Sequence, residues 1–206
     1  VRFTLRRVSQ LALVAAVGLV GVGVAIGQQQ PVIGKTYAES KEGQKPQPPK
    51  AKADAPNVIW ILLDDVGFGA VSAFGGPVPT PTFDALANDG LRYSNFHTTG
   101  ICSPTRAALL TARNHNAVGM GAFPHDFMSA EFPGYTGRLQ PKDGTVAEYL
   151  RNAGYSTYAL GKWHLTPDAE ITDLGPLDRW QSAKGFDHFF GFLGGAEDQY
   201  KRILIE

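Results

Sequence analysis

One short stretch of the chain combines a reactive side chain with groups that bind anions. Cys102, the only cysteine among 206 residues, is followed by Ser103, Pro104 and Arg106. Ser103 is a favourable N-cap and Pro104 a favourable first helical residue, so a helix is predicted to begin here, with Cys102 just before it. Backbone N–H groups and the dipole of that helix end favour negative charge beside Cys102. Arg106, about one turn along, adds a cation whose fork fits a tetrahedral oxyanion.

The structural alternative is a buried cysteine ahead of an ordinary helix, because free cysteine often behaves as a small hydrophobic residue. The string from Cys102 to Arg106, however, resembles the modification and active-site motif of the type I sulfatases. In that family a dedicated maturation enzyme oxidises the cysteine to formylglycine, whose hydrate is the nucleophile. The resemblance implies that Cys102 is the precursor of this nucleophile and that Arg106 neutralises charge on the transferring sulfuryl group. One departure lies nearby, since the family usually continues Thr-Gly-Arg and this chain has Ala112 in the middle position.

Two adjacent acids, Asp64 and Asp65, follow the continuous apolar run 57–63. The run is too short for a typical helix and predicts a central strand of a parallel sheet covered on both faces. Ligands collect beyond the carboxyl ends of such strands. Neighbouring carboxylates there repel each other unless a cation lies between them, and oxygen ligands favour Ca²⁺ or Mg²⁺ over zinc. The alternative is a turn in which both aspartates cap backbone N–H groups.

The acidic segment is also similar to the first metal-binding segment of the sulfatases. That resemblance implies that Asp64 and Asp65 coordinate a divalent cation, Ca²⁺ in preference to Mg²⁺. The same resemblance implies that the residue formed from Cys102 is a third ligand of this cation.

A further helix and strand are predicted later in the chain. Thr145 and Glu148 form a capping box, and Gly154 ends the helix that follows. Residues 155–160 then have the composition of a strand. Because a helix between two strands is the βαβ pattern, this strand is expected to run parallel to the strand at 57–63.

Lys162 and His164 lie at the carboxyl end of the strand predicted over 155–160 and are therefore expected on the same rim as Asp64 and Asp65. Lys162 offers a positive charge to a sulfate oxygen, and His164 a titratable hydrogen-bond partner for the nucleophile. Taken alone, such a pair is more often a solvated strand edge. The surrounding string from Gly154 to His164, however, resembles the second sulfatase motif.

Several other segments complete the predicted fold. A short helix is expected over 83–90, a half-buried strand over 91–97, and a surface loop over 123–142. The aromatic run 185–195 resembles a segment of bacterial arylsulfatases that packs beside the sheet. These elements indicate an α/β fold, with a mostly parallel sheet and helices on both faces, as in the alkaline-phosphatase and sulfatase superfamily.

Composition divides the chain into three parts. Residues 1–27 carry early arginines and a long apolar run, which is typical of a bacterial signal peptide, so export to the periplasm or medium is expected. An uncleaved membrane anchor is the alternative. Residues 28–55 are rich in Gln, Pro, Lys and Ala, and this composition predicts a disordered linker. Residues 56–206 form the catalytic-domain portion, and the balanced charge, 19 basic and 19 acidic residues, argues against nucleic acid as a partner.

The resemblance implies hydrolysis of sulfate esters by sulfuryl transfer to the hydrated aldehyde made from Cys102. It covers only the N-terminal portion of the family's catalytic domain, and the later Asp-Asn metal pair, second histidine and second lysine of the family have no counterpart here. Two alternatives stay open. One is a phosphonate or phosphate ester hydrolase of the same superfamily, and the other is a truncated, non-catalytic fragment.

Overall fold

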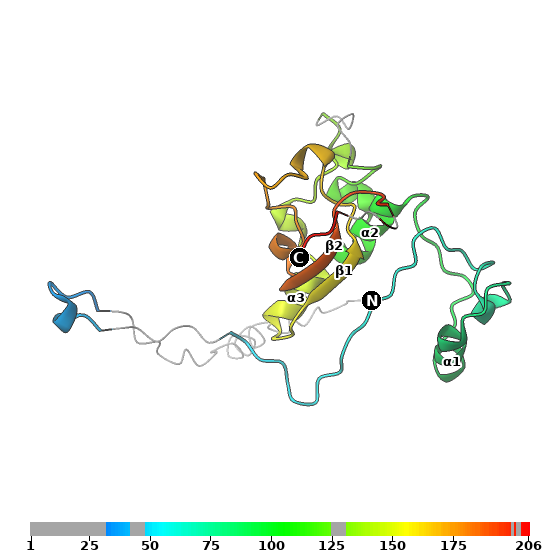
Figure 1. Cartoon of the computed structure of the whole chain (residues 1–206), viewed down its shortest axis with the longest axis horizontal. Helices are drawn as coiled ribbons and strands as arrows, with labels where there is room; N and C mark the ends of the chain where they lie inside the picture. Colours follow the sequence, from blue (N-terminus) through cyan, green and yellow to red (C-terminus); the bar gives the residue numbers. More distant parts are fainter. Residues whose placement is uncertain (1–31, 42–47, 125–130, 199, 201–202) are drawn as a thin grey trace, which may run out of the picture. The chain divides into compact units, whose positions relative to one another are not determined.

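The computed structural model describes residues 32–41, 48–124, 131–198, 200 and 203–206 (Figure 1). The chain forms two compact units, Val1–Pro48 and Pro49–Glu206. In the first unit, Val32 pairs with Lys41 in an antiparallel bridge that encloses a 3₁₀ turn at Tyr37–Glu39. The signal peptide predicted over 1–27 lies outside the described residues and stays a prediction. Within the described ranges, no helix has the length and apolar content needed to cross a bilayer.

The sheet of the second unit pairs two strands in parallel, β1 (Tyr158–Lys162) and β2 (His188–Phe192). Their register sets Gly161 opposite Gly191, and a Cβ at Gly191 would collide with the backbone of Gly161. The close approach of the two backbones therefore depends on glycine at position 191, since a Cβ at Gly161 would meet nothing within 4 Å. Ile205 adds an antiparallel bridge to Gly191.

Among the described residues, three α-helices accompany this sheet. α1 spans Pro81–Asp89 and stops at Gly90, and α2 spans Cys102–Thr111. α3 spans Val146–Asn152 and begins with the predicted capping box, because Thr145 and Glu148 each accept a hydrogen bond from the other's backbone N–H. Short 3₁₀ turns lie at Ser72–Phe74, His115–Val118, Pro133–Tyr135, Pro141–Asp143, Asp168–Glu170 and Ser182–Lys184.

The buried core joins α2 to the ends of the strands. It consists of Ala107, Val118, Met120, Leu139, Trp163, Leu165 and Leu193. Trp163 is the member that matters most for the site, because it lies between Lys162 and His164 in sequence. Its indole is 5% exposed and donates a hydrogen bond to the Arg179 carbonyl at 3.2 Å. The strand end that carries Lys162 and His164 is thus anchored from within the core.

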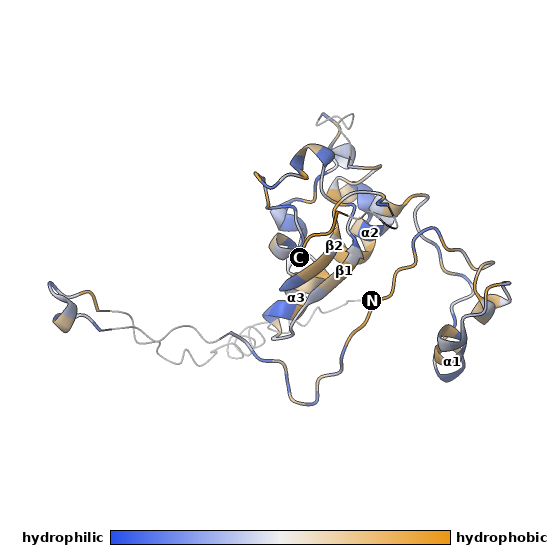
Figure 2. Cartoon of the chain, viewed as in Figure 1, coloured by the Kyte–Doolittle hydropathy of each residue, from blue (hydrophilic) through white to orange (hydrophobic). Residues whose placement is uncertain are grey.

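The α/β class with parallel pairing is confirmed, but the expected partner of β1 is wrong. The run 57–63 is not a strand in the structure, and its side chains are exposed, Ile59 to 80%. Figure 2 shows this stretch, just before Asp64, as an extended hydrophobic segment. A run that is apolar on both faces needs covering layers and neighbouring strands, and the described part of the chain supplies neither.

Three smaller predictions about strands also need correction. Residues 91–97 form no strand, and Leu91 is 82% exposed. The strand expected over 155–160 begins at Tyr158 and runs to Lys162, because pairing with β2 sets its ends. The aromatic run 185–195 does not pack beside the sheet, since it contributes β2 itself.

Candidate active site

Cys102 is the first residue of α2, and Ile101 takes the N-cap position that was predicted for Ser103. The Thr105 hydroxyl donates to the Ile101 carbonyl at 3.0 Å and pairs with the Thr99 hydroxyl at 2.6 Å. These hydrogen bonds stabilise the N-terminus of α2 at Ile101, and the Ser103 side chain does not act as an N-cap. Ser103 is fully buried, and its hydroxyl has no hydrogen-bond partner among the described residues. The Ser103 hydroxyl is therefore a buried polar group that the described residues leave unsatisfied.

The His164 imidazole contacts Cys102 directly. Its Nδ1 lies 3.2 Å from the Cys102 Sγ, and the His164 side chain is buried. The backbone N–H of His164 donates to the Leu193 carbonyl at 2.9 Å, so the strand pairing continues past β1 and fixes this residue. His164 has a φ of 55°, in the left-handed region that non-glycine residues rarely adopt. Such backbone strain persists only where the surroundings hold it, and it concentrates at functional sites.

Asp64 joins the two predicted sulfate-binding cations. Lys162 Nζ lies 2.7 Å from one carboxylate oxygen, and Arg106 Nη2 lies 3.2 Å from the other. Arg106 also donates from Nη1 to the Lys162 carbonyl at 2.7 Å. Both cationic side chains are nearly buried, 11% exposed for Arg106 and 12% for Lys162. One carboxylate thus faces two cations, which leaves a net positive charge in the cluster.

The environment of Asp64 alters its acidity. Partial burial by itself would raise the pKa of Asp64, but hydrogen bonds from Lys162 and Arg106, together with their charges, outweigh burial. The net effect holds the pKa below its ordinary value of 3.8. Asp64 is therefore ionised at neutral pH. Arg106 Nε, in contrast, is buried without a hydrogen-bond partner within the described ranges, so the guanidinium keeps an unused donor.

Asp65 lines the same open hollow as Asp64, Cys102 and Arg106, a cavity of about 930 Å³. Its φ of 56° turns the chain sharply after the apolar run. The described residues contain no group of three or more His, Cys, Asp or Glu side chains that could hold a metal ion. Both oxygens of Asp64 are engaged by cations instead. The described residues alone do not form the metal centre that the two acids and Cys102 predicted, so the ligand assignment stays a prediction.

Three further histidines have local partners. His97 lies 2.7 Å from the Asn95 side chain, and His115 Nδ1 lies 3.1 Å from the Met120 carbonyl. His188 stacks on Tyr158 with a centroid distance of 4.9 Å. Each of the three rings thus has a partner away from Cys102.

Two residues near His164 carried no signal in the sequence. Phe123 stacks on the imidazole with a centroid distance of 5.3 Å and an interplanar angle of 22°. Gly195 packs against the same ring, where a Cβ would come within 2.5 Å of Nε2. Neither residue type marks a functional position, and only the fold brings them to His164.

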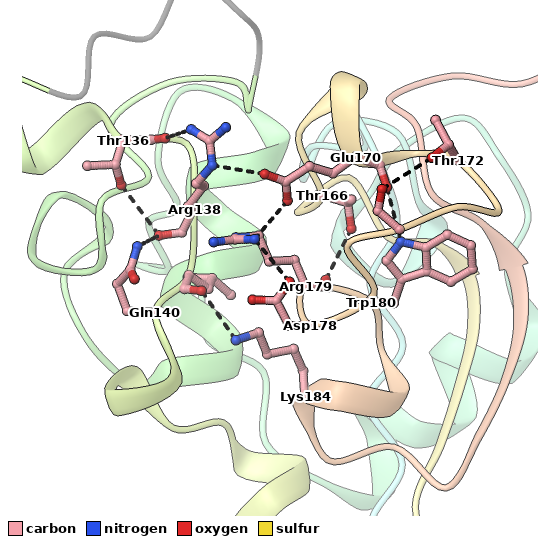
Figure 3. A network of polar contacts seen from close by, with 12 residues as sticks. Thr136, Arg138, Gln140, Thr166, Glu170, Thr172, Asp178, Arg179, Trp180 and Lys184 are labelled. Atoms are coloured by element: carbon pink, nitrogen blue, oxygen red, sulfur yellow. Dashed lines mark hydrogen bonds and ion pairs between the residues drawn. The ribbon is translucent and has the colours of Figure 1, made fainter.

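A polar network centred on Glu170 joins the segment that follows β1 to the loop that carries Arg138 (Figure 3). The Glu170 carboxylate accepts from Arg138 Nε and Arg179 Nη1, both at 3.0 Å. The Arg179 carbonyl in turn accepts from the Trp163 indole and from the Thr166 hydroxyl. The network therefore ties the segment after β1 to the loop that carries Arg138, which supports the backbone next to Lys162 and His164.

Comparison with known proteins adds to this geometry. A family model described as Sulfatase matches residues 56–204. The chain is 37% identical over 154 residues to an arylsulfatase of Klebsiella aerogenes, covering 75% of this chain and 32% of that protein. It is 39% identical over 143 residues to arylsulfatase A of Homo sapiens, covering 68% and 26%.

A crystal structure of Ps i-CgsB has 27% sequence identity and a TM-score of 0.48, covering 66% of this chain and 27% of that one. This chain spans about a quarter to a third of the length of the curated relatives it matches. The match of the family model over most of the chain, together with the Cys102 motif and the groups around it, establishes that this chain belongs to the sulfatase family.

Proposed function

We propose that this chain is the nucleophile-bearing part of an arylsulfatase-like enzyme that hydrolyses sulfate esters. The observation that carries the proposal is the 3.2 Å contact between Cys102 Sγ and His164 Nδ1, next to the Arg106 and Lys162 cations. Family membership supports the reaction class. The names of the relatives support an aryl ester, as do Phe68, Phe74 and Phe96 in the lining of the hollow.

The nucleophile in this proposal is formylglycine, made from Cys102 by a maturation enzyme. Its hydrated aldehyde supplies the oxygen that attacks sulfur. Cys102 suits this conversion because it is only partly buried and is the first residue of α2. The unpartnered Ser103 hydroxyl and Arg106 Nε offer donors in the same helical turn.

Arg106 and Lys162 bind and orient the sulfate group in this scheme. A sulfate monoester carries one negative charge and competes with Asp64 for two nearly buried cations. Charge-assisted hydrogen bonds from these cations strengthen as charge accumulates on the transferring oxygens, which lowers the barrier to transfer.

His164 moves the proton that accompanies release of sulfate. Its Nδ1 is within hydrogen-bond distance of the side-chain atom at position 102, which is the first requirement for a general acid or base. An imidazole can accept a proton at a ring nitrogen and later return it, which this role requires.

A divalent cation at Asp64 and Asp65, Ca²⁺ rather than Mg²⁺, belongs to the proposal through the resemblance. Two adjacent carboxylates suit a hard cation, but further oxygen ligands from outside the described residues are needed to complete its coordination. Export to the periplasm or medium, through the segment 1–27, is likewise proposed. Contact with a membrane is proposed only if that segment stays uncleaved.

The decisive experiment is a peptide-map mass spectrum of the protein from its native host, read at the peptide that contains Cys102. Loss of the thiol mass in favour of the aldehyde is the expected result. An unmodified Cys102 in a host that converts other sulfatases contradicts the nucleophile assignment and favours a non-catalytic fragment.

Relative turnover of an aryl sulfate and a matched aryl phosphonate monoester then separates the two ester classes. The proposal expects the sulfate to be preferred and the Cys102→Ala variant to be inactive. Preference for the phosphonate supports the phosphoryl-transfer alternative instead.

A further inference from the structure

The His164 imidazole is held between two neighbours that are distant in sequence. On one side Phe123 stacks at 5.3 Å, and on another Gly195 brings its backbone against the ring. A Cβ built at Gly195 would lie 2.5 Å from Nε2, 2.6 Å from Cε1 and 3.2 Å from Cδ2. His164 as a whole is only 5% exposed, so the ring has little space to move aside.

We propose that Gly195 is a positioning residue, whose missing side chain lets the His164 ring place Nδ1 against residue 102. This inference rests on the proposed function and assigns a new role within its site. Gly195 touches no reacting atom and acts only through His164.

The requirement for glycine at position 195 comes from contact and not from backbone conformation. Gly195 is absent from the glycines with left-handed φ, so a residue with a side chain meets no left-handed backbone strain there. The contact itself forces a shift, because a Cβ closer than 3.0 Å to another atom is essentially never seen and the atoms it would meet belong to the His164 ring. A methyl group at position 195 must therefore displace the imidazole. Since Phe123 covers the ring elsewhere, the 3.2 Å approach to Cys102 is lost.

Gly194 provides a matched control one residue away. A Cβ at Gly194 would meet only the Ala196 carbonyl oxygen, at 3.8 Å, which is an ordinary van der Waals contact. Gly194 also lacks a left-handed φ. Gly194→Ala and Gly195→Ala thus add the same methyl group to the same loop, and only the second meets His164.

Steady-state kinetics of the formylglycine-bearing protein on an aryl sulfate test the role. Gly195→Ala is expected to lower kcat about 100-fold, the scale of a small misplacement of a catalytic group, with little change in KM. Gly194→Ala is expected to keep wild-type kcat. In a His164→Ala background, Gly195→Ala is expected to have no further effect, because the ring through which it acts is gone. Wild-type kcat in Gly195→Ala, or an effect that adds fully to that of His164→Ala, overturns the proposal.

A measurement on the unconverted protein separates this inference from the proposed function. Nuclear Overhauser contacts between the Gly195 α-protons and the His164 ring are expected in the wild type. The ring signals are expected to shift in Gly195→Ala and stay in place in Gly194→Ala. Unchanged ring signals in Gly195→Ala overturn the positioning role, whether or not the protein hydrolyses sulfate esters.

If Gly195→Ala fails to fold, the double variant Gly195→Ala with His164→Ala decides the matter. Removal of the ring relieves the clash, so the double variant is expected to fold. If His164→Ala folds and the double variant does not, the glycine serves another contact, and the proposal falls.

Discussion

The imidazole Nδ1 of His164 lies 3.2 Å from the Sγ of Cys102, across 62 residues of sequence. The two atoms come from different elements, since Cys102 opens α2 and His164 follows β1 by two residues. Backbone pairing of His164 with Leu193 and the burial of Trp163 hold one side of this contact, and α2 holds the other. The contact is thus a product of the core and not of local sequence.

His164→Asn tests the chemical role of this contact. The amide keeps a hydrogen-bonding group near position 102 but cannot carry a proton at neutral pH. Turnover of an aryl sulfate is expected to fall by about 10² to 10⁴, the usual share of general acid–base catalysis, while conversion of Cys102 stays complete. His188→Asn, which removes a ring that stacks on Tyr158 at the start of β1, serves as control. Turnover within a factor of two of wild type in His164→Asn rules out the proton-transfer role.

The Asp64 ion pairs predict a specific dependence of stability on pH. Because the folded-state pKa of Asp64 lies below 3.8, its contribution is present above that value and is lost as pH falls through the folded pKa. Asp64→Asn lacks this contribution. At neutral pH the difference in unfolding free energy is expected to stay below about 1 kcal/mol, because the carboxylate is partly exposed and screened.

Urea unfolding of wild type and Asp64→Asn across the acid range measures this difference. The two unfolding free energies are expected to converge as the pH drops below 3.8. A gap that stays constant with pH means that the ion pairs with Lys162 and Arg106 do not stabilise the fold.

The Glu170 network predicts unequal costs for two similar substitutions. Glu170 and Asp178 each lie 3.0 Å from Arg179 Nη1, but the Glu170 side chain is 10% exposed and that of Asp178 is 55% exposed. Glu170→Gln leaves two guanidinium groups beside a neutral amide and is expected to cost about 3 kcal/mol. Asp178→Asn is expected to cost less than about 1 kcal/mol. If the two substitutions lower the free energy of unfolding in urea by the same amount, burial does not determine how strongly these ion pairs stabilise the protein.

The backbone conformation of Ala112 predicts that its replacement by glycine stabilises the protein. It ends α2 with a φ of 53°, the left-handed cap conformation that glycine adopts without strain, and it is exposed. Ala112→Gly is therefore expected to raise the free energy of unfolding by about 0.5 to 1 kcal/mol.

Ala153 is the matched control, because it ends α3 as an exposed alanine with a φ of −84°. Ala153→Gly relieves no strain and is expected to destabilise the protein slightly. A loss of stability in both variants, measured by urea unfolding, contradicts the assignment of strain to Ala112.

Helices were predictable from the sequence where their signals are local. The capping box of Thr145 and Glu148 and the stop at Gly90 act within one turn, so neither depends on the rest of the fold. The exception is Ser103, where the Thr99 and Thr105 hydroxyls support the helix entry and move the cap to Ile101.

Strands were predicted less well because they depend on partners. The composition of 57–63 is that of a buried strand, yet no neighbour pairs with it among the described residues. The pairing of β1 with β2 could not be read from either segment alone. Phe123 and Gly195 could not be predicted as site residues at all. Their roles, a stacking ring and a missing methyl group, depend on contact with His164, which only the fold provides.

The exposed run 58–63 has a consequence for the behaviour of the chain in solution. Six consecutive residues of high β-propensity, without charge or proline, form the type of segment that nucleates cross-β aggregates. Pro56 precedes the run, and Asp64 and Asp65 follow it directly, which is where gatekeeper residues oppose stacking of identical chains. The two carboxylates proposed for cation binding are thus also expected to protect solubility. A variant in which Asp64 and Asp65 are both neutralised is expected to aggregate during expression, whether or not it binds a cation or hydrolyses an ester.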